Sequence, residues 1–302
     1  MRALFVFLDG VGIGPADASL NPFLRARLPF LQGLLGSIPT LTAPRSELRG
    51  DGSREAVAFP LDATLTTEGI PQSGTGQTSL LTGVNAAERF GRHFGPWTPV
   101  ALRPLLEADN ILGRARDAGL SVAFANAYPR GWPGTRRRLA APPLAAHTSG
   151  LLTRHAEALA TGDAVSSEIV NDGWIERLGY RDLDRPTPAT AGQRLAAIAS
   201  DHDLTFFAHY QTDIAGHRGG ERGAIDALET VDAFLGSALD HLPPDVSLLV
   251  ASDHGNVEDL SGGHTRNPAL GLLVGPGAVD RAGPLRSITD VAPGLLSWLS
   301  EA

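Results

Sequence analysis

The chain of 302 residues contains no cysteine, and all 25 of its Lys/Arg positions are arginine, so lysine is absent as well. Without cysteine there can be no disulfide, no thiolate nucleophile and no thiolate metal site. Without lysine there is no Schiff-base chemistry and no lysine general base, and arginine becomes the only fixed cation for gripping a phosphate group. The available chemistry therefore rests on carboxylates, histidines, hydroxyls and arginines.

Long basic or apolar runs are scarce too. The formal net charge is −8, and the one basic tract is Arg136-Arg137-Arg138, so a nucleic-acid-binding surface is not indicated. The N-terminal apolar run stops at Asp9, which makes it too short for a signal-peptide core or a membrane span. We therefore expect a cytoplasmic protein without nucleic-acid or membrane partners. The sequence does not indicate an oligomeric state.

What the chain does contain is an alternation of apolar runs and helical patterns. The runs are typical of buried strands and lie at residues 2–8, 121–126, 204–210, 246–252 and 269–275. Apolar residues with a period near 3.6 recur between them, at 101–118 and 221–241. This alternation predicts an α/β fold: a doubly wound, mainly parallel sheet with helices on both faces.

One segment breaks the alternation. Residues 127–200 are rich in proline, arginine and alanine and carry few strand signals. We predict a catalytic core formed by residues 1–126 and 201–302, with residues 127–200 inserted as a small cap. The alternative is a long, partly helical excursion of the same domain, which composition does not exclude.

Ionisable residues gather where the predicted strands end. Each one alone would be weak evidence, because an aspartate after a strand is often a turn former and a single histidine is often structural. Together they are more informative, since the carboxyl ends of parallel strands share one edge of a sheet. The residues concerned are Asp9, Asp213, His217, Asp253, His254 and His264.

Three aspartates and three histidines indicate a metal centre. They are too many ligands for one tetrahedral zinc with an open position and about the right number for two ions. Mixed imidazole and carboxylate ligands favour manganese, zinc, iron or cobalt over calcium or magnesium. The residues therefore predict two divalent ions, with manganese and zinc as the leading candidates. A rival dinucleotide-binding interpretation of "GVGIG" is weak, because the spacing is wrong and Asp9 would repel a pyrophosphate.

The stretch "IPQSGTGQTSLLTG" at 70–83 looks like a phosphate-binding loop that has lost its lysine. With "LDGVGIG", "TDIAGH", "SDHGN" and "HTRNP" it resembles the alkaline phosphatase superfamily, specifically the branch of cofactor-independent phosphoglycerate mutase and phosphopentomutase. The resemblance covers about residues 1–126 and 201–302. It implies Ser73 as the catalytic nucleophile, with Thr75 as runner-up. It also implies one metal held by Asp9, Asp253, His254 and Ser73, and another by Asp213, His217 and His264.

The loop departs from the mutase pattern at Gly74 and Gln77, where the mutases carry Glu and His. The mutase lysine near the transferred phosphate has no equivalent, and the chain is much shorter than those enzymes. Phosphoryl transfer is thus implied more firmly than a mutase outcome. A sulfatase is disfavoured, because Ser73 lacks the sequence context of a formylglycine precursor. Four arginines are candidate ligands of the substrate phosphate: Arg130, Arg136, Arg218 and Arg266.

These features predict a two-metal phosphatase or phosphomutase that acts on a small phosphorylated metabolite through a phosphoserine intermediate. Two alternatives remain open at this level. One is a phosphodiesterase or phosphonate hydrolase on the same metal site, and the other is a non-catalytic metal-binding paralogue.

Overall fold

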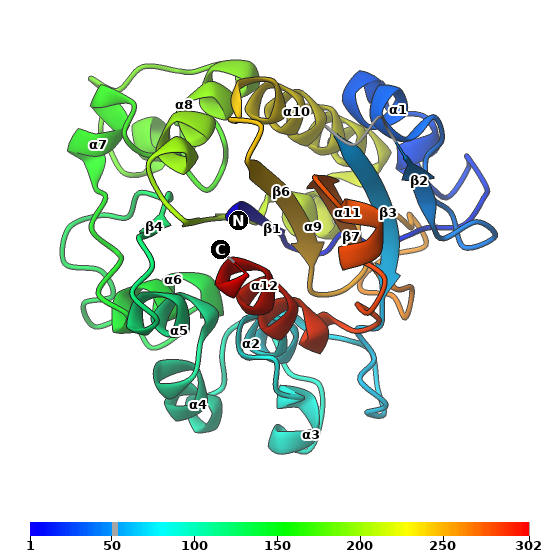
Figure 1. Ribbon diagram of the computed structural model, residues 1–302, viewed down its shortest axis with the longest axis horizontal. Coiled ribbons are helices and arrows are strands. Elements are labelled where there is room, and N and C mark those ends of the chain that lie inside the picture. Colours follow the sequence, from blue (N-terminus) through cyan, green and yellow to red (C-terminus); the bar gives the residue numbers. More distant parts are fainter. Residues whose placement is uncertain (50–53, 302) are drawn as a thin grey trace.

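A computed structural model of the chain describes residues 1–49 and 54–301. One seven-stranded sheet runs through it in the order β2-β3-β7-β6-β1-β5-β4 (Figure 1). Its strands are β1 (Arg2–Leu8), β2 (Ser46–Leu48), β3 (Glu55–Leu61), β4 (Val122–Phe124), β5 (Leu204–His209), β6 (Val246–Ser252) and β7 (Ala269–Gly275). The pairs β1–β5, β1–β6 and β4–β5 are parallel, whereas β7 runs antiparallel to both β6 and β3.

The predicted α/β fold is confirmed, with mixed strand directions. All five predicted runs are strands, but β7 points the opposite way from β1, β4, β5 and β6. This reversal matters for the site, because β7 starts at the edge where β6 ends. The segment that leads into β7 therefore lies at the carboxyl edge of the parallel strands, and it carries His264.

Helices cover both faces of the sheet, as Figure 1 shows. They are α1 (Pro29–Leu35), α2 (Ser73–Thr82), α3 (Ala86–Phe90), α4 (Arg103–Ala108), α5 (Ile111–Asp117), α6 (Ala141–Thr148), α7 (Ala156–Thr161), α8 (Pro188–Ser200), α9 (Gln211–Arg218), α10 (Gly220–His241), α11 (Ala278–Arg281) and α12 (Val291–Ser300). The pattern at 101–118 forms two helices instead of one, because Asn110 caps α5 by accepting from the N–H groups of Leu112 and Gly113.

The alternating side chains of β1 divide the core into two layers. Ala3, Phe5 and Phe7 pack with residues of α2, α5, α6 and α12, whereas their neighbours along the strand pack with residues of α1, α8 and α10 on the other face. This alternation follows from the two-residue period of a strand, and burial on both faces explains the continuous apolar run. No helix of the described residues is long and apolar enough to cross a membrane.

The segment 127–200 contributes to both layers. Buried residues of α6 belong to one layer and those of α8 to the other, and α8 packs along α10. Between these helices, Ala127, Leu159, Ala164 and Trp174 form a small apolar cluster of their own. The division into a catalytic core and an inserted cap stays a prediction.

Candidate metal centre

Asp9 lies where three parallel strands end side by side. The registers pair Leu8 with His209 of β5 and with Ser252 of β6, so Asp9 is the first residue beyond these pairs, and its backbone N–H donates to the carbonyl of His209 at 3.0 Å. The residue is 6% exposed. Gly10 follows with φ +66°, and a Cβ at this position would lie 2.6 Å from Oδ1 of Asp213. Glycine is needed here both for the left-handed backbone and for the close approach of α9.

Asp253 and His254 follow β6 and are fully buried. Nε2 of His254 lies 3.4 Å from Oδ1 of Asp9 and 3.6 Å from Oδ2 of Asp253. The other oxygen of Asp253 accepts a hydrogen bond of 3.3 Å from the N–H of Gly10. Three of the four residues that the resemblance assigns to one metal therefore meet at the ends of β1 and β6.

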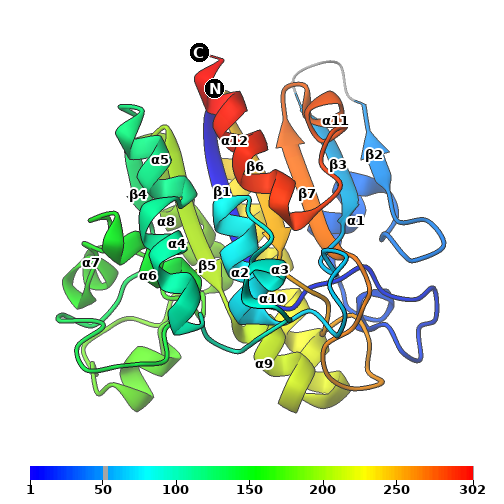
Figure 2. The ribbon, with the colours of Figure 1, turned by 90° about the horizontal axis from the view of Figure 1, so that it is seen from below.

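The second predicted group lies beside the first. Asp213 and His217 are one turn apart on α9, with Oδ2 and Nε2 3.5 Å from each other. His264 reaches them from the segment before β7: its Nε2 lies 3.3 Å from Oδ1 of Asp213 and 2.9 Å from Nε2 of His217. The rings of His254 and His264 stack with centroids 3.9 Å apart, so the two groups are contiguous. Figure 2 shows α9 at the end of the sheet opposite the two termini.

Ser73 is the first residue of α2 and joins the first group. Its Oγ lies 3.0 Å from Nε2 of His254, and the residue is 2% exposed. The runner-up, Thr75, is turned elsewhere: its hydroxyl lies 3.2 Å from the carbonyl of Gln72 and accepts from the N–H of Phe94 at 3.1 Å. Ser73 thus has the hydroxyl that faces the candidate metal ligands, whereas the hydroxyl of Thr75 forms hydrogen bonds with the backbone of neighbouring segments.

The donor set fits a divalent cation. Oδ1 of Asp9 and Oδ2 of Asp253 are buried without a hydrogen-bond partner, which is costly for carboxylate oxygens unless a cation lies between them. Donor atoms of Asp213, His217 and His264 all lie within 4.8 Å of one another, as do those of Asp9, Asp213 and His254. Neutral imidazole and carboxylate are ligands of the transition metals and zinc.

The pKa shifts of these residues also indicate that positive charge is favourable between the buried carboxylates. Burial raises the pKa of Asp9, and it raises that of Asp253 well above the usual range. Burial acts to lower the pKa of His254, but the charges of Asp253 and Asp9 outweigh it and raise this pKa to about 10. In the metal-free protein, the proton on His254 therefore supplies positive charge next to the two carboxylates, which a bound metal ion would otherwise supply.

Two carboxamides that the sequence did not single out as ligand partners hold the ligand carboxylates. Nε2 of Gln77 donates to Oδ2 of Asp9 at 2.9 Å. Nδ2 of Asn256 donates to Oδ1 of Asp213 at 2.7 Å and to the carbonyl of the same residue at 3.1 Å. Such partners orient metal ligands and tune their basicity.

Glu258 is a buried carboxylate that the sequence analysis missed. It is 0% exposed, and it accepts from the N–H of Gly12 at 2.9 Å and the N–H of Asn256 at 2.7 Å. Its other oxygen accepts from Thr265 at 2.7 Å and from Asn267 at 3.0 Å. Glu258 thereby ties together the three loops that carry Asp9, the pair after β6, and His264.

This carboxylate also explains two glycines. A Cβ at Gly12 would lie 2.6 Å from Glu258 Cδ, and a Cβ at Gly255 would lie 2.3 Å from Glu258 Oε1. Gly12 of "GVGIG" therefore makes room for a carboxylate that its backbone binds. The motif lets the loops that carry the candidate metal ligands pack together, in agreement with the weak case for a dinucleotide site.

The four arginines proposed for phosphate binding are all exposed, and they are Arg130, Arg136, Arg218 and Arg266. Arg130 pairs with Glu157 on the surface at 3.1 Å. Arg218 ends α9 one residue after His217, and Arg266 follows His264 by two residues. Among residues 1–49 and 54–301, no hydrogen bond or ion pair joins any of the four to the metal ligands or to Ser73. Their role in substrate binding stays a prediction.

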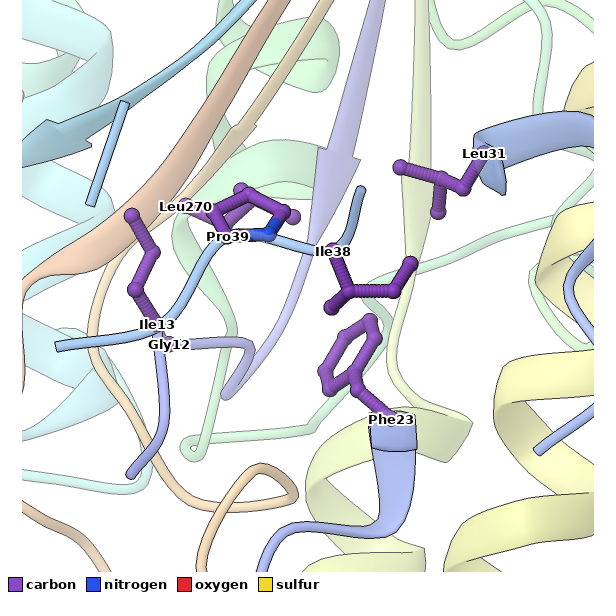
Figure 3. Close-up of a pocket in the computed structure, with 7 residues that line it drawn as sticks. All are labelled: Gly12, Ile13, Phe23, Leu31, Ile38, Pro39 and Leu270. Carbon is purple, nitrogen blue, oxygen red and sulfur yellow. The ribbon is translucent and has the colours of Figure 1, made fainter. Parts of the chain in front are cut away.

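A small cavity lies behind the Gly12 loop, lined by Gly12, Ile13, Phe23, Leu31, Ile38, Pro39 and Leu270 (Figure 3). Its volume is about 10 Å³, and its lining side chains are apolar. A space of this size holds at most about one water molecule and offers no partner to a phosphate. The candidate site is therefore the ligand cluster itself, on the polar side of the loop.

Comparisons with known proteins agree with this geometry. Residues 186–296 match the family model described as "Metalloenzyme superfamily". A 2,3-bisphosphoglycerate-independent phosphoglycerate mutase of Syntrophotalea carbinolica is 40% identical over 124 residues, which are 37% of this chain and 24% of that protein. The match therefore spans about a quarter of the mutase, and the rest of that enzyme has no counterpart in the alignment.

Two solved structures share the fold along the whole chain. The PH0037 protein from Pyrococcus horikoshii has a TM-score of 0.57 at 14% identity, covering 100% of this chain and 98% of that one. The alkaline phosphatase from the Antarctic bacterium TAB5 has a TM-score of 0.53 at 12% identity, covering 99% and 97%. Identities this low establish the architecture only.

Proposed function

We propose that this chain is a metalloenzyme of the alkaline phosphatase superfamily and that it transfers the phosphoryl group of a small phosphorylated metabolite through Ser73. The match of residues 186–296 to the metalloenzyme family model and the similarity to a cofactor-independent phosphoglycerate mutase support this proposal. The observation that supports this most is the hydroxyl of Ser73 in contact with His254, beside the other five candidate ligand side chains. A phosphatase or a phosphomutase would use this arrangement in the same first step.

Two divalent ions, manganese or zinc, would be held by the two groups. One ion would be held by Asp9, Asp253, His254 and Ser73. The other ion would be held by Asp213, His217 and His264. When bound, the ions supply the positive charge that lowers the pKa of the serine hydroxyl and neutralises phosphate oxygens. Carboxylate oxygens of Asp9 and Asp253 that are buried without a hydrogen-bond partner are costly, and this supports the assignment.

The chain's own residues set up the displacement. Oγ of Ser73 gives up its proton and forms a bond to phosphorus while the bond from phosphorus to the ester oxygen breaks. The leaving oxygen takes up a proton, so one proton is lost and one is gained in the step. Ser73 is the first residue of α2, so the partial positive charge of the helix N-terminus lies next to the incoming phosphate. The product of this step is a phosphoserine at position 73.

The acceptor of the second step distinguishes the two outcomes. Water releases inorganic phosphate and makes the enzyme a phosphatase, whereas a second hydroxyl of the substrate makes it a phosphomutase. That the substrate is a small phosphorylated metabolite is part of the proposal. A cytoplasmic location and the absence of nucleic-acid and membrane partners remain predictions from composition.

One experiment tests this proposal. Protein stripped with a chelator and reloaded with Mn²⁺ or Zn²⁺ is incubated with sugar phosphates, glycerate phosphates, an aryl phosphate, a phosphodiester and a phosphonate. Free phosphate and isomerised product are measured side by side. Metal-dependent turnover of a monoester is expected. Turnover of the diester or phosphonate alone would favour the alternative hydrolase, and metal-loaded protein that turns over none of them would contradict the proposal.

A further inference from the structure

Gln77 occupies a buried position between the metal ligands and the segment 127–200. It lies one turn after Ser73 on α2 and is 1% exposed. Its Nε2 donates to Oδ2 of Asp9 at 2.9 Å, and its Oε1 accepts from the backbone N–H of Ala141, the first residue of α6, at 3.3 Å. Both ends of the carboxamide are therefore used.

The chemistry of the two partners fixes the orientation of this amide. A carboxylate oxygen can only accept, and a backbone N–H can only donate. Rotating the amide by half a turn would place its oxygen against Asp9 and its NH₂ group against the N–H of Ala141. The orientation shown is thus the one in which both contacts are attractive.

This contact makes the two oxygens of Asp9 unequal. Oδ2 is hydrogen-bonded to Gln77, whereas Oδ1 is buried without a hydrogen-bond partner and lies 3.4 Å from Nε2 of His254. The amide thus leaves Oδ1 as the oxygen that faces the other ligands of the group. It also carries no charge, so it orients the carboxylate without competing with a cation for it.

We infer that Gln77 is the positioning residue that holds Asp9 as a one-oxygen metal ligand and links this ligand to the start of α6. This inference rests on the proposed function, because it assumes that Asp9 binds a metal ion. Gln77 touches no reacting atom. Asn256 makes the corresponding contact with Asp213 at 2.7 Å, so each of the two ligand groups has one carboxamide on a carboxylate.

The experiment measures metal binding directly. Wild-type protein, Gln77→Met and the matched surface variant Gln193→Met are stripped of metal and titrated with Mn²⁺ in equilibrium dialysis, with bound metal measured by elemental analysis. Methionine has a similar length and shape but no N–H donor. Gln193 is exposed on α8 and provides the same substitution away from the site. We expect Gln77→Met to bind one of its two Mn²⁺ ions, the one held by Asp9, about 10- to 100-fold less tightly than wild type.

A second variant separates positioning from a loss of folding. Gln77→His keeps an N–H donor at a similar reach and is expected to recover most of the lost metal affinity. If Gln77 only filled space, metal affinity would not depend on whether the substituted side chain has an N–H donor. The circular dichroism spectrum and thermal midpoint of each metal-free variant are recorded alongside. Folded Gln77→Met with wild-type affinity would overturn the inference and leave the proposed function standing. Wild-type protein that binds no Mn²⁺ would overturn both.

Discussion

Oγ of Ser73 lies 3.0 Å from Nε2 of His254, although 181 positions separate the two residues in the chain. The contact exists because α2 begins where β1 and β6 end, so the hydroxyl at its first position meets the ligands that follow these strands. The contact places the serine of a glycine-rich loop that has no lysine beside a cluster of carboxylates and histidines that can bind a cation.

The first prediction concerns the nucleophile. Ser73→Ala removes the hydroxyl that attacks phosphorus, and turnover of the best phosphomonoester is expected to fall by roughly three orders of magnitude or more. Metal content should change little, because the other ligands remain. Steady-state rates and elemental analysis on the same sample check both points.

Thr75→Val is the matched control for that variant. It removes the alternative hydroxyl, whose contacts are with Gln72 and Phe94. Thermal stability is expected to drop while metal-dependent turnover persists. If Thr75→Val abolished turnover in folded protein and Ser73→Ala did not, the runner-up would be the nucleophile.

A second prediction concerns the number of ions. His217→Ala removes one of three donors from the group with Asp213 and His264, so one of two bound equivalents should be lost at a fixed free concentration of Mn²⁺. His241→Ala changes an exposed histidine in the last turn of α10 and serves as the control. Equal metal content in the two variants would mean that this group binds no ion.

A third prediction concerns the carboxylate that ties the ligand loops. Glu258 accepts four hydrogen bonds while 0% exposed, and Glu258→Gln turns one accepting oxygen into an NH₂ group that faces other donors. The free energy of unfolding is expected to fall by about 2 to 3 kcal/mol. Denaturant titration of the metal-free protein measures it, with Glu107→Gln on the exposed side of α4 as control. A change equal to the control would show that the loops hold together without this carboxylate.

A fourth prediction concerns pH and a histidine outside the ligand set. Burial lowers the pKa of His209 to about 4, and its Nδ1–H donates to the carbonyl of Ser167 at 2.9 Å. The unfolded chain therefore binds this proton more readily than the folded one, so stability is lost as pH falls from about 6.5 towards 4 and is unaffected above that range. The loss attributable to this residue is about 3 kcal/mol at the low end.

His209→Gln tests that assignment, because glutamine retains an N–H donor but does not titrate. The difference in unfolding free energy between wild type and variant should shrink or reverse in favour of the variant between pH 7 and pH 4. A difference that stays constant with pH would show that His209 titrates normally in the folded protein.

The sequence was sufficient for most of the sheet and for the prediction that the candidate ligand residues lie together. Continuous apolar runs predicted five strands, and aspartates and histidines at their ends predicted a shared edge. Strand β3 was missed because Pro60 interrupts it, yet this strand pairs along its length with β7. Strand β2 has three residues, which is too short for a pattern.

The residues behind the ligands could not be found in the same way. Gln77 is 68 positions from Asp9, Asn256 is 43 from Asp213, and Glu258 is 246 from Gly12. No local period or spacing connects such pairs, and they become visible only once the strands bring the loops together. Gly12 was a signal for Glu258 in the sequence, but it was weighed only as part of a dinucleotide motif, which its spacing disfavoured.

The most direct test of the central claim is to trap the phosphorylated enzyme. Metal-loaded protein is mixed with its best phosphomonoester, quenched in acid within the first turnovers, digested, and examined by mass spectrometry for a phosphorylated residue in the peptide that contains positions 70–83. The account predicts one phosphoryl group on Ser73, absent from metal-stripped protein and from Ser73→Ala. Continued turnover with Ser73 unmodified, or with phosphate on another side chain, would contradict it.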